Sequence, residues 1–324
     1  SNSLQLGLWR YSEIMLHPII DQEGIDIQRE AVKEEKRIRD NQPYSRFYEA
    51  LKSNLFKEHT YKNPLIGVPE HLDNAVLQDF LDFRNNFYMP SNAVFVVAGD
   101  IEIETTKNLI SKYFSAVPAA EKNDRVVIKE EPIVKEIRAV EYDPNIQIPA
   151  LVIGYRTPSM KSREARVLDL ISTYLSDGPS SKLYKRMVDN NKTALQVSAS
   201  NIGHEDYSMY YILSLPLGET SLEQLSIEID EEILKIQQNL ISENDYEKLQ
   251  NKFENQFVNS NSSASGIGVS LAQYHTLYGD ANLINSEIEI YRSISRDEIR
   301  DVAKKYLNTN QRLFLEYLPE NEKK

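Results

Sequence analysis

The stretch IDIQREAVKEEKRIRDNQPYSRF, residues 25–47, holds an acidic side chain at a position where chemistry is possible. At 100° per residue in a helix, Glu35 lies in the middle of an apolar stripe whose members fall within about 80° of it. Those members are Ile25, Ile27, Ala31, Val32 and Ile38. Gln28 lies two turns earlier and almost in line with Glu35. A carboxylate on a face meant for burial is costly unless a cation or hydrogen-bond donors meet it. Glu35 is therefore a candidate ligand, and a solvated glutamate at the helix edge is the ordinary alternative.

The histidines do not supply a metal site by local spacing. They are His17, His59, His71, His204 and His275, and none belongs to a His-x-x-x-His or His-x-x-Glu-His pair. The chain has no cysteine, which removes thiolate ligands, disulfides and cysteine nucleophiles together. Any zinc that Glu35 binds needs further ligands that this spacing does not provide.

Composition indicates a globular protein of two ordinary domains, with 324 residues, 41% hydrophobic and 27% charged. The net charge of −12 argues against a nucleic-acid partner, and no apolar run is long enough to span a membrane. We therefore expect a soluble protein, and cytoplasm and periplasm both stay open. A helix expected at residues 4–16 has no strand before it. This start favours a chain that is the C-terminal part of a longer protein.

The elements that position Glu35 read as a mixture of helices and strands, which favours an α+β fold over a doubly wound sheet. Helices are expected within 25–47 and at 4–16, 44–56, 74–88, 104–114, 162–175, 182–189, 221–240 and 243–259. Strands are expected at 93–100, 136–143, 148–156, 193–202, 207–217 and 312–318. The strand at 93–100, AVFVVAGD, is expected to be buried because it is almost wholly apolar.

Two features indicate the domain organisation. Residues 119–134, rich in charge and bounded by prolines, read as a linker between domains at 1–118 and 135–324. A weak internal repeat places Tyr88 and Asn92 at the same spacing as Tyr306 and Asn310, each pair between a helix and an apolar strand. The repeat suggests that both domains end with the same supersecondary unit.

Several segments resemble the M16 metallopeptidases, the group that contains insulinase, pitrilysin and the mitochondrial processing peptidase. In the first half they are QREAVKEEKRIRDNQPYSRF, HTYKNPLIG, LQDFLDFRNNFYMPSNAVFVVAGDI and LISKYFSAVP. In the second half they are IPALVIGYRTP, LSDGPSSKLYKRMV and SRDEIRDVAKKYLNTNQRLFLEYLP. The likeness follows the family order along essentially the whole chain. It implies two similar α/β domains, the first incomplete, and pairs of such domains that close around a chamber.

The resemblance also implies a role for Glu35. The family binds zinc through an inverted motif, His-x-x-Glu-His, and a glutamate on a later helix, whose context matches Ala31-Val32-Lys33-Glu34-Glu35. Glu35 would be the third ligand, and the two histidines would lie upstream of residue 1. Zinc is thus expected in the full-length protein and none on this chain alone. Gln28 stands where active members usually have a supporting glutamate.

A second departure concerns the substrate clamp, an Arg and a Tyr seven residues later in many active members. Val188 and Leu195 occupy those places, and Arg186 would be turned away on its helix. The resemblance implies a zinc endopeptidase subunit that cleaves peptides or unfolded segments beside a second M16-like subunit, identical or different. The alternative is a non-catalytic partner or scaffold, and a weaker third reading is a peptide-binding module.

Overall fold

The computed structural model describes residues 3–119 and 125–323, and residue contacts divide the chain into two compact units. Unit 1 comprises Ser1–Lys36, Ile66–Val126 and Phe257–Asn285. Unit 2 comprises Arg37–Leu65, Val127–Gln256 and Ser286–Lys324. The division into 1–118, a linker at 119–134 and 135–324 stays a prediction, since it follows family domains and not contacts. Residues 120–124 of that linker lie outside the described residues.

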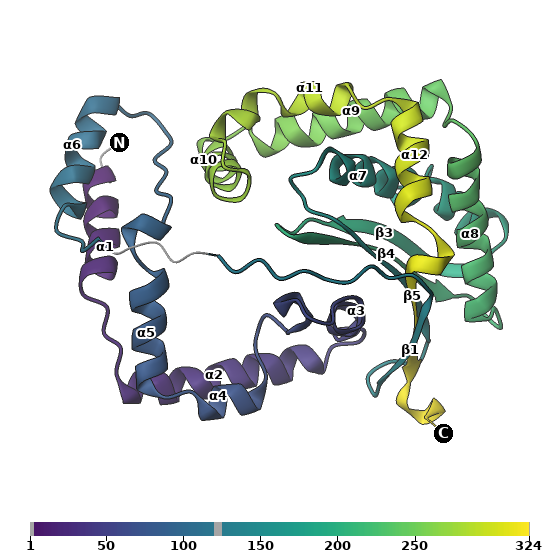
Figure 1. The fold of residues 1–324 in the computed structure, drawn as a ribbon, viewed down its shortest axis with the longest axis horizontal. Helices are drawn as coiled ribbons and strands as arrows, with labels where there is room; N and C mark the ends of the chain where they lie inside the picture. The colour runs from purple at the N-terminus through teal and green to yellow at the C-terminus, as the bar shows by residue number, and fades with distance from the viewer. Residues whose placement is uncertain (1–2, 120–124, 324) are drawn as a thin grey trace. The chain divides into compact units, whose positions relative to one another are not determined.

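All regular elements in the described part of unit 1 are helices (Figure 1). Its α-helices are α1 (Leu4–Leu16), most of α2 (Gln22–Asp40), α4 (Pro69–Asn74), α5 (Leu77–Phe87), α6 (Ile103–Phe114) and α10 (Ala264–Gln273). The shorter elements are η2 (Pro90–Asn92), η4 (Tyr274–Tyr278) and η5 (Ala281–Asn285). Helix α10 begins within the Ser- and Asn-rich residues 259–268. The short η1 (Thr60–Lys62), which precedes α4 in the chain, belongs to unit 2.

The predicted buried strand at 93–100 is wrong for this structure. Residues 93–98 follow η2 without pairing to any described strand, and Val94 and Phe95 are 40% and 47% exposed. The sequence pattern is that of a strand, but a strand is stabilised by ladder bonds and packing from its neighbours. No described part of unit 1 offers a neighbouring strand.

Unit 2 is built on one mixed sheet with strand order β1-β5-β2-β4-β3. The strands are β1 (Ile137–Asp143), β2 (Ala150–Pro158), β3 (Ala194–Ile202), β4 (Tyr207–Pro216) and β5 (Arg312–Pro319). Strand β1 runs parallel to β5, and the other neighbours are antiparallel. Five of the six predicted strands are thus confirmed, and so is the α+β class.

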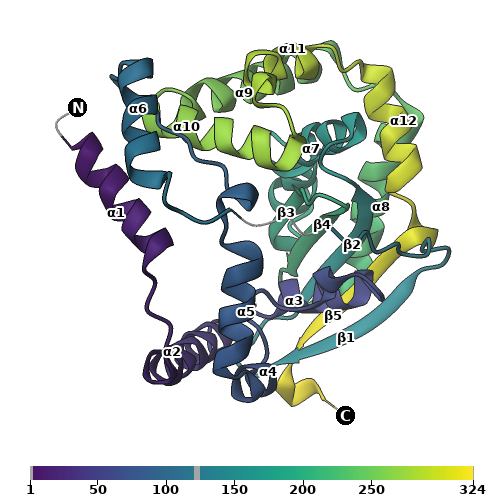
Figure 2. The ribbon, with the colours of Figure 1, turned by 60° about the vertical axis from the view of Figure 1, so that its left-hand side comes forward.

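Helices cover both faces of this sheet (Figures 1 and 2). One face packs against α7 (Arg163–Ser176), α8 (Leu222–Gln238) and α12 (Arg296–Tyr306) in the main core. Helices α9 (Glu243–Ser260) and α11 (Glu287–Arg292) also contribute to this core. Three of these helices begin where the sequence supplies an N-cap: the Oγ atoms of Ser162, Ser221 and Ser295 accept backbone N–H bonds from α7, α8 and α12.

Helix α3 (Phe47–Leu55) packs on the other face of the same sheet. Leu51 and Leu55 are fully buried there, together with Val152 of β2 and Leu315 of β5. Because side chains alternate along a strand, Val152 points toward α3 while Ile153 points toward the main core. A helix from the N-terminal third of the chain is therefore an integral layer of unit 2.

Candidate functional site

The candidate zinc ligand lies on α2, and the structure exposes the helix face that carries it. Glu35 and Gln28 are both exposed, and Ile27 and Ile38 on the same side are 60% and 57% exposed. The expectation that this stripe is buried is therefore wrong among the described residues. Of its apolar members, Ile25 alone is buried.

The covered face of α2 is a different one because a cationic row makes polar contacts there. Arg29 donates from Nε to the Leu72 carbonyl at 2.8 Å and from Nη2 to the Ala75 carbonyl at 2.9 Å. Lys33 pairs with Asp73. These acceptors lie at the C-terminal end of α4, where carbonyls lack helical partners and the helix dipole favours cations. The contacts fix the rotation of α2 and leave Glu35 outside the covered face.

Glu35 is one carboxylate, and zinc needs at least three protein ligands. Among residues 3–119 and 125–323, no group of three or more His, Cys, Asp or Glu side chains could hold a metal ion. His59, which is buried, is already engaged: its Nε2 lies 3.0 Å from Asp206 Oδ2, and its Nδ1 accepts from the Tyr61 N–H. Among the described residues, the exposed Glu35 carboxylate could therefore supply one ligand of a zinc site and no more.

The two positions of the expected substrate clamp are apolar and lie in different settings. Val188, in η3 (Tyr184–Asn190), packs half-buried against the main core of unit 2. Leu195 is 47% exposed and falls at the register shift of β3 between Ala194 and Gln196. A bulge of this kind turns a side chain out of the regular pleat. Neither side chain can donate a hydrogen bond to a peptide.

Arg186, the nearest cation to the clamp, is held by α8. Its guanidinium contacts Glu228 at 3.4 Å and Glu232 at 3.0 Å, and it also pairs with Glu231. Asn191 donates to the same Glu228 at 2.7 Å. Because three carboxylates meet this guanidinium, Arg186 serves to fix η3 against α8, and no sequence spacing indicated that partnership.

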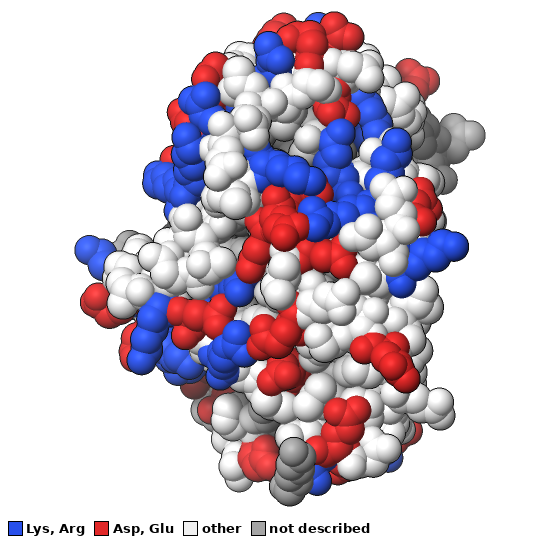
Figure 3. All heavy atoms as spheres, turned by 90° about the vertical axis from the view of Figure 1, so that its right-hand side faces the viewer, with Lys and Arg blue, Asp and Glu red and all other residues white. Residues whose placement is uncertain are grey.

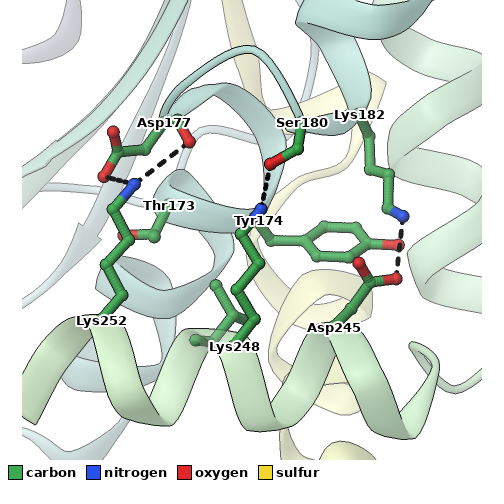
Figure 4. Close-up of a pocket in the computed structure, with 9 residues that line it drawn as sticks. Thr173, Tyr174, Asp177, Ser180, Lys182, Asp245, Lys248 and Lys252 are labelled. Carbon is green, nitrogen blue, oxygen red and sulfur yellow. Dashed lines mark hydrogen bonds and ion pairs between the residues drawn. The ribbon is translucent and has the colours of Figure 1, made fainter.

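Lysine side chains join the loop at residues 177–181 to α9 (Figure 4). Lys252 pairs with Asp177, Lys248 contacts the Ser180 hydroxyl, and Lys182 pairs with Asp245 at 2.8 Å. The hollow between them has about 10 Å³ of free space. That volume holds about one water molecule, so these contacts stabilise the loop against α9 and leave no room for a larger ligand.

The face drawn in Figure 3 shows no single-sign charge field. On the face drawn in Figure 3, Lys and Arg side chains lie among Asp and Glu side chains, so the net charge of −12 does not appear as one acidic field there. Interspersed charge of this kind keeps a protein soluble and selects no partner by sign. Among the described helices, none is long and apolar enough to cross a membrane.

Unit 1 also has an apolar groove of about 810 Å³ between α1 and α5. Its lining residues come from both helices and the segment after each: Ile14, Met15, Pro18, Ile20, Phe80, Phe83, Arg84, Phe87, Tyr88, Asn92 and Ala93. Phe83, Phe87 and Tyr88 are 55%, 46% and 66% exposed. The described chain therefore leaves much of the apolar face of α5 uncovered. Exposed apolar surface of this extent is typical of an interface.

Comparison with known proteins places this fold in a family. The family model described as "Peptidase M16 inactive domain" matches residues 74–253. The chain belongs to the M16 peptidase family.

Individual relatives agree. Zinc protease PqqE from Helicobacter pylori is 27% identical over 250 residues, which cover 76% of this chain and 56% of that protein. The crystal structure of a protease from Helicobacter pylori superposes with a TM-score of 0.91 at 22% identity, over 98% of this chain and 77% of that one. A peptidase M16 inactive domain from Pseudomonas fluorescens gives a TM-score of 0.84 at 12% identity, over 97% of this chain and 74% of that one. This chain therefore spans little more than half of the first curated relative.

Proposed function

We propose that this chain is part of a zinc-dependent M16 endopeptidase subunit, to which it contributes Glu35 as a metal ligand. The observation on which the proposal depends is the exposure of Glu35 on a helix face with two uncovered isoleucines. A carboxylate in that setting is free to meet a cation, and the isoleucines are free to pack against a docking segment. Zinc, when bound, polarises a peptide carbonyl and activates water.

The rest of unit 1 supports the same proposal. The groove between α1 and α5 is largely exposed, and residues 93–98 have no strand partner among the described residues, although Phe95 contacts Phe114 of α6. A segment with strands of its own would pair with residues 93–98 and cover the apolar groove. We propose that the segment with the His-x-x-Glu-His motif does so in the full-length protein. The substrates would be peptides or unfolded segments held in a closed chamber between this subunit and a second M16-like subunit, identical or different.

The second candidate is a non-catalytic M16-fold partner or scaffold. Three positions favour it: Gln28 is neutral where a glutamate would support the metal, and Val188 and Leu195 cannot act as a polar clamp. The matched family model is itself described as an inactive domain, which fits this candidate only weakly. In a paired peptidase, such a chain would fold and assemble normally but leave zinc binding to its partner.

The test compares Glu35→Gln with Glu30→Gln in the full-length protein encoded by the gene, purified with and without candidate partner subunits. Glu30 is the matched control because it is an exposed glutamate on the same helix, away from the apolar stripe. We expect Glu35→Gln to lower zinc content and chelator-sensitive peptide cleavage by about 10-fold or more, whereas Glu30→Gln leaves both unchanged. Equal zinc content and cleavage in both variants would reject the assignment of Glu35. The scaffold would be favoured if this chain bound no zinc but still assembled fully with a partner that binds zinc and is active.

A further inference from the structure

The segment that leads into the sheet of unit 2 is extended but is not part of the sheet. Residues 127–136, here termed the strap, precede β1 and form no helix or strand. They include the end of the linker predicted from the sequence. Val127 and Val134 are 67% and 79% exposed, so apolar packing by these two side chains contributes little to holding the strap. Nearer β1, Ile133 packs half-buried against the α3 core, and Glu136 Oε2 lies 2.8 Å from Arg312 Nε. A further contact holds the strap closer to its N-terminal end.

That contact is a carboxylate bound by three consecutive backbone amides. Glu130 Oε1 accepts from the N–H groups of Lys57, Glu58 and His59 at 2.9, 2.8 and 2.7 Å. Oε2 accepts from Lys57 N–H at 3.1 Å. Successive N–H groups that converge on one point form an anion-binding nest. This nest is the loop that follows α3, about seventy residues away from Glu130 in sequence.

Arg156 of β2 completes the site from the sheet. Its Nη1 lies 2.7 Å from Glu130 Oε2 and 3.2 Å from the Leu55 carbonyl oxygen, to which it also donates. Its Nη2 donates to the Glu131 carbonyl, and the Glu130 N–H donates to the Tyr207 hydroxyl at 3.1 Å. The side chains of Glu130 and Arg156 are 1% and 9% exposed. The site is therefore desolvated, in contrast to an ordinary surface ion pair.

The electrostatics agree with this geometry. Burial alone would raise the pKa of Glu130, but the backbone N–H groups of His59, Lys57 and Glu58 and the charge of Arg156 outweigh it and hold that pKa below its usual value. Hydrogen bonds and charges that favour the ionised form have this effect.

We propose that residues 57–59 and Arg156 form a carboxylate-binding site that fastens the strap to unit 2 through Glu130. The side chain of Glu130 is the bound ligand, and the nest is able to take a small free carboxylate in its place. The predicted linker is then not a free tether along its whole length, because its last part is locked from Glu130 onward. The inference concerns unit 2 and does not depend on zinc or on peptidase activity.

The experiment measures hydrogen exchange of the full chain for Glu130→Ala, Glu130→Gln and the control Glu131→Gln. Glu131 is the neighbouring glutamate, its side chain is exposed, and its substitution leaves the nest intact. Glu130→Ala is expected to speed amide exchange in the strap and at residues 57–59 on the order of tenfold or more, and Glu131→Gln to leave both unchanged. Glu130→Gln keeps the side-chain volume and one acceptor oxygen, so its exchange rates should fall between those of Glu130→Ala and Glu131→Gln.

Added formate separates a built site from a general loss of structure. In Glu130→Ala, formate is expected to restore protection of residues 57–59 but not of the strap, because the free ion fills the nest without tethering residues 127–136. The same addition should have no effect in Glu130→Ala/Arg156→Ala. If amide exchange in the strap kept its wild-type rate in both Glu130 variants, Glu130 would not fasten the strap and that part of the proposal would be overturned. The proposal of an anion site would be overturned if formate did not slow exchange at residues 57–59 in Glu130→Ala. It would also be overturned if formate slowed that exchange equally in the double variant.

Discussion

Arg166 and Glu287 form a two-point ion pair inside unit 2. The Nε–Oε1 distance is 2.8 Å and the Nη2–Oε2 distance is 3.0 Å, and the two side chains are 8% and 7% exposed. The pair joins α7 to α11, which are more than a hundred residues apart in the chain. Two parallel N–H···O bonds match the planar guanidinium to the carboxylate and fix the relative position of the helices.

Removal of one partner should therefore destabilise unit 2 strongly. Arg166→Met leaves Glu287 buried without its cation, and we expect the free energy of unfolding to fall by about 3–5 kcal/mol. The double variant Arg166→Met/Glu287→Leu removes both charges and should recover most of that loss. Urea unfolding followed by far-UV circular dichroism measures all three proteins.

The control for this prediction lies one turn earlier on α7. Arg163 pairs with Glu298, and the two side chains are 43% and 37% exposed. Exposed pairs contribute about 0–1 kcal/mol, so Arg163→Met should cost much less than Arg166→Met. Equal losses in the two single variants would contradict the argument from burial.

The carboxyl of Asp169 lies beside the Arg166–Glu287 pair and predicts a dependence of stability on pH. It accepts from Asn201 Nδ2 and from the Tyr291 hydroxyl, each at 2.8 Å. Burial raises its pKa to about 6, even though these donors and Arg166 lower it. The folded pKa thus exceeds the unfolded value of about 3.9, so its contribution to stability is complete below pH 4 and is lost as the pH rises through 6.

Asp169→Asn should remove that loss because the amide does not titrate. A difference of two pKa units corresponds to roughly 3 kcal/mol of stability lost between about pH 4 and pH 6 in the wild type. Urea midpoints measured from pH 4 to pH 7 should fall less steeply for the variant. Glu298→Gln is the control of opposite sign. The hydrogen bond from Arg163 is the main cause that lowers the pKa of Glu298 to about 2, so the contribution of Glu298 to stability is lost only as the pH falls into the acid range. An unchanged slope in Asp169→Asn would reject the assignment.

The internal repeat shows how far local sequence predicts this fold. After α5 and η2 come residues 93–98, and after α12 and η6 (Thr309–Gln311) comes β5. Both copies have the predicted helix, turn and extended segment. Among the described residues, only the β5 copy has strand neighbours, since it pairs with β1 and β2. The same local pattern thus predicted a strand correctly at 312–318 and wrongly at 93–100, because strand formation depends on distant partners.

The candidate site shows the same limit. Helical periodicity found the stripe around Glu35, but the face that α2 buries is turned by roughly 100° from it at the helical angle per residue. The contacts that decide this, from Arg29 to Leu72 and Ala75, span 43 and 46 residues. The glutamates that hold Arg186 lie 42–46 residues away from it. No local window contains such pairs.

Zinc binding by residues 1–324 alone should be weak. Glu35 supplies a single carboxylate, whereas zinc sites in proteins use three or four protein ligands. After dialysis against metal-free buffer, we expect well below one zinc per chain by elemental analysis, and no difference between wild type and Glu35→Ala. Stoichiometric zinc that survives dialysis would show a complete site in this chain, and its loss in Glu35→Ala would place that site at α2.

The contact between Gly154 of β2 and Leu51 of α3 gives the sharpest test of the α3 layer. A Cβ on residue 154 would overlap Leu51 Cδ1 and touch Leu55 Cδ1. Because Leu51 is fully buried, α3 would have to shift from the sheet, and we expect Gly154→Ala to cost about 1–3 kcal/mol. Leu51→Ala leaves a cavity and should cost about 2–5 kcal/mol. In the double variant the new methyl group occupies part of that cavity.

The two losses should therefore not add, and the double variant should be more stable than their sum by about 0.5–3 kcal/mol. The matched control is Gly7→Ala in α1, where an added Cβ meets nothing within 4 Å. Alanine favours a helix over glycine by about 0.5–1 kcal/mol, so this change should not destabilise the protein. Urea unfolding of the four proteins of the cycle and the control gives the coupling directly. Strict additivity would mean that Leu51 and Gly154 are not in contact, and α3 would then not be a layer on this sheet.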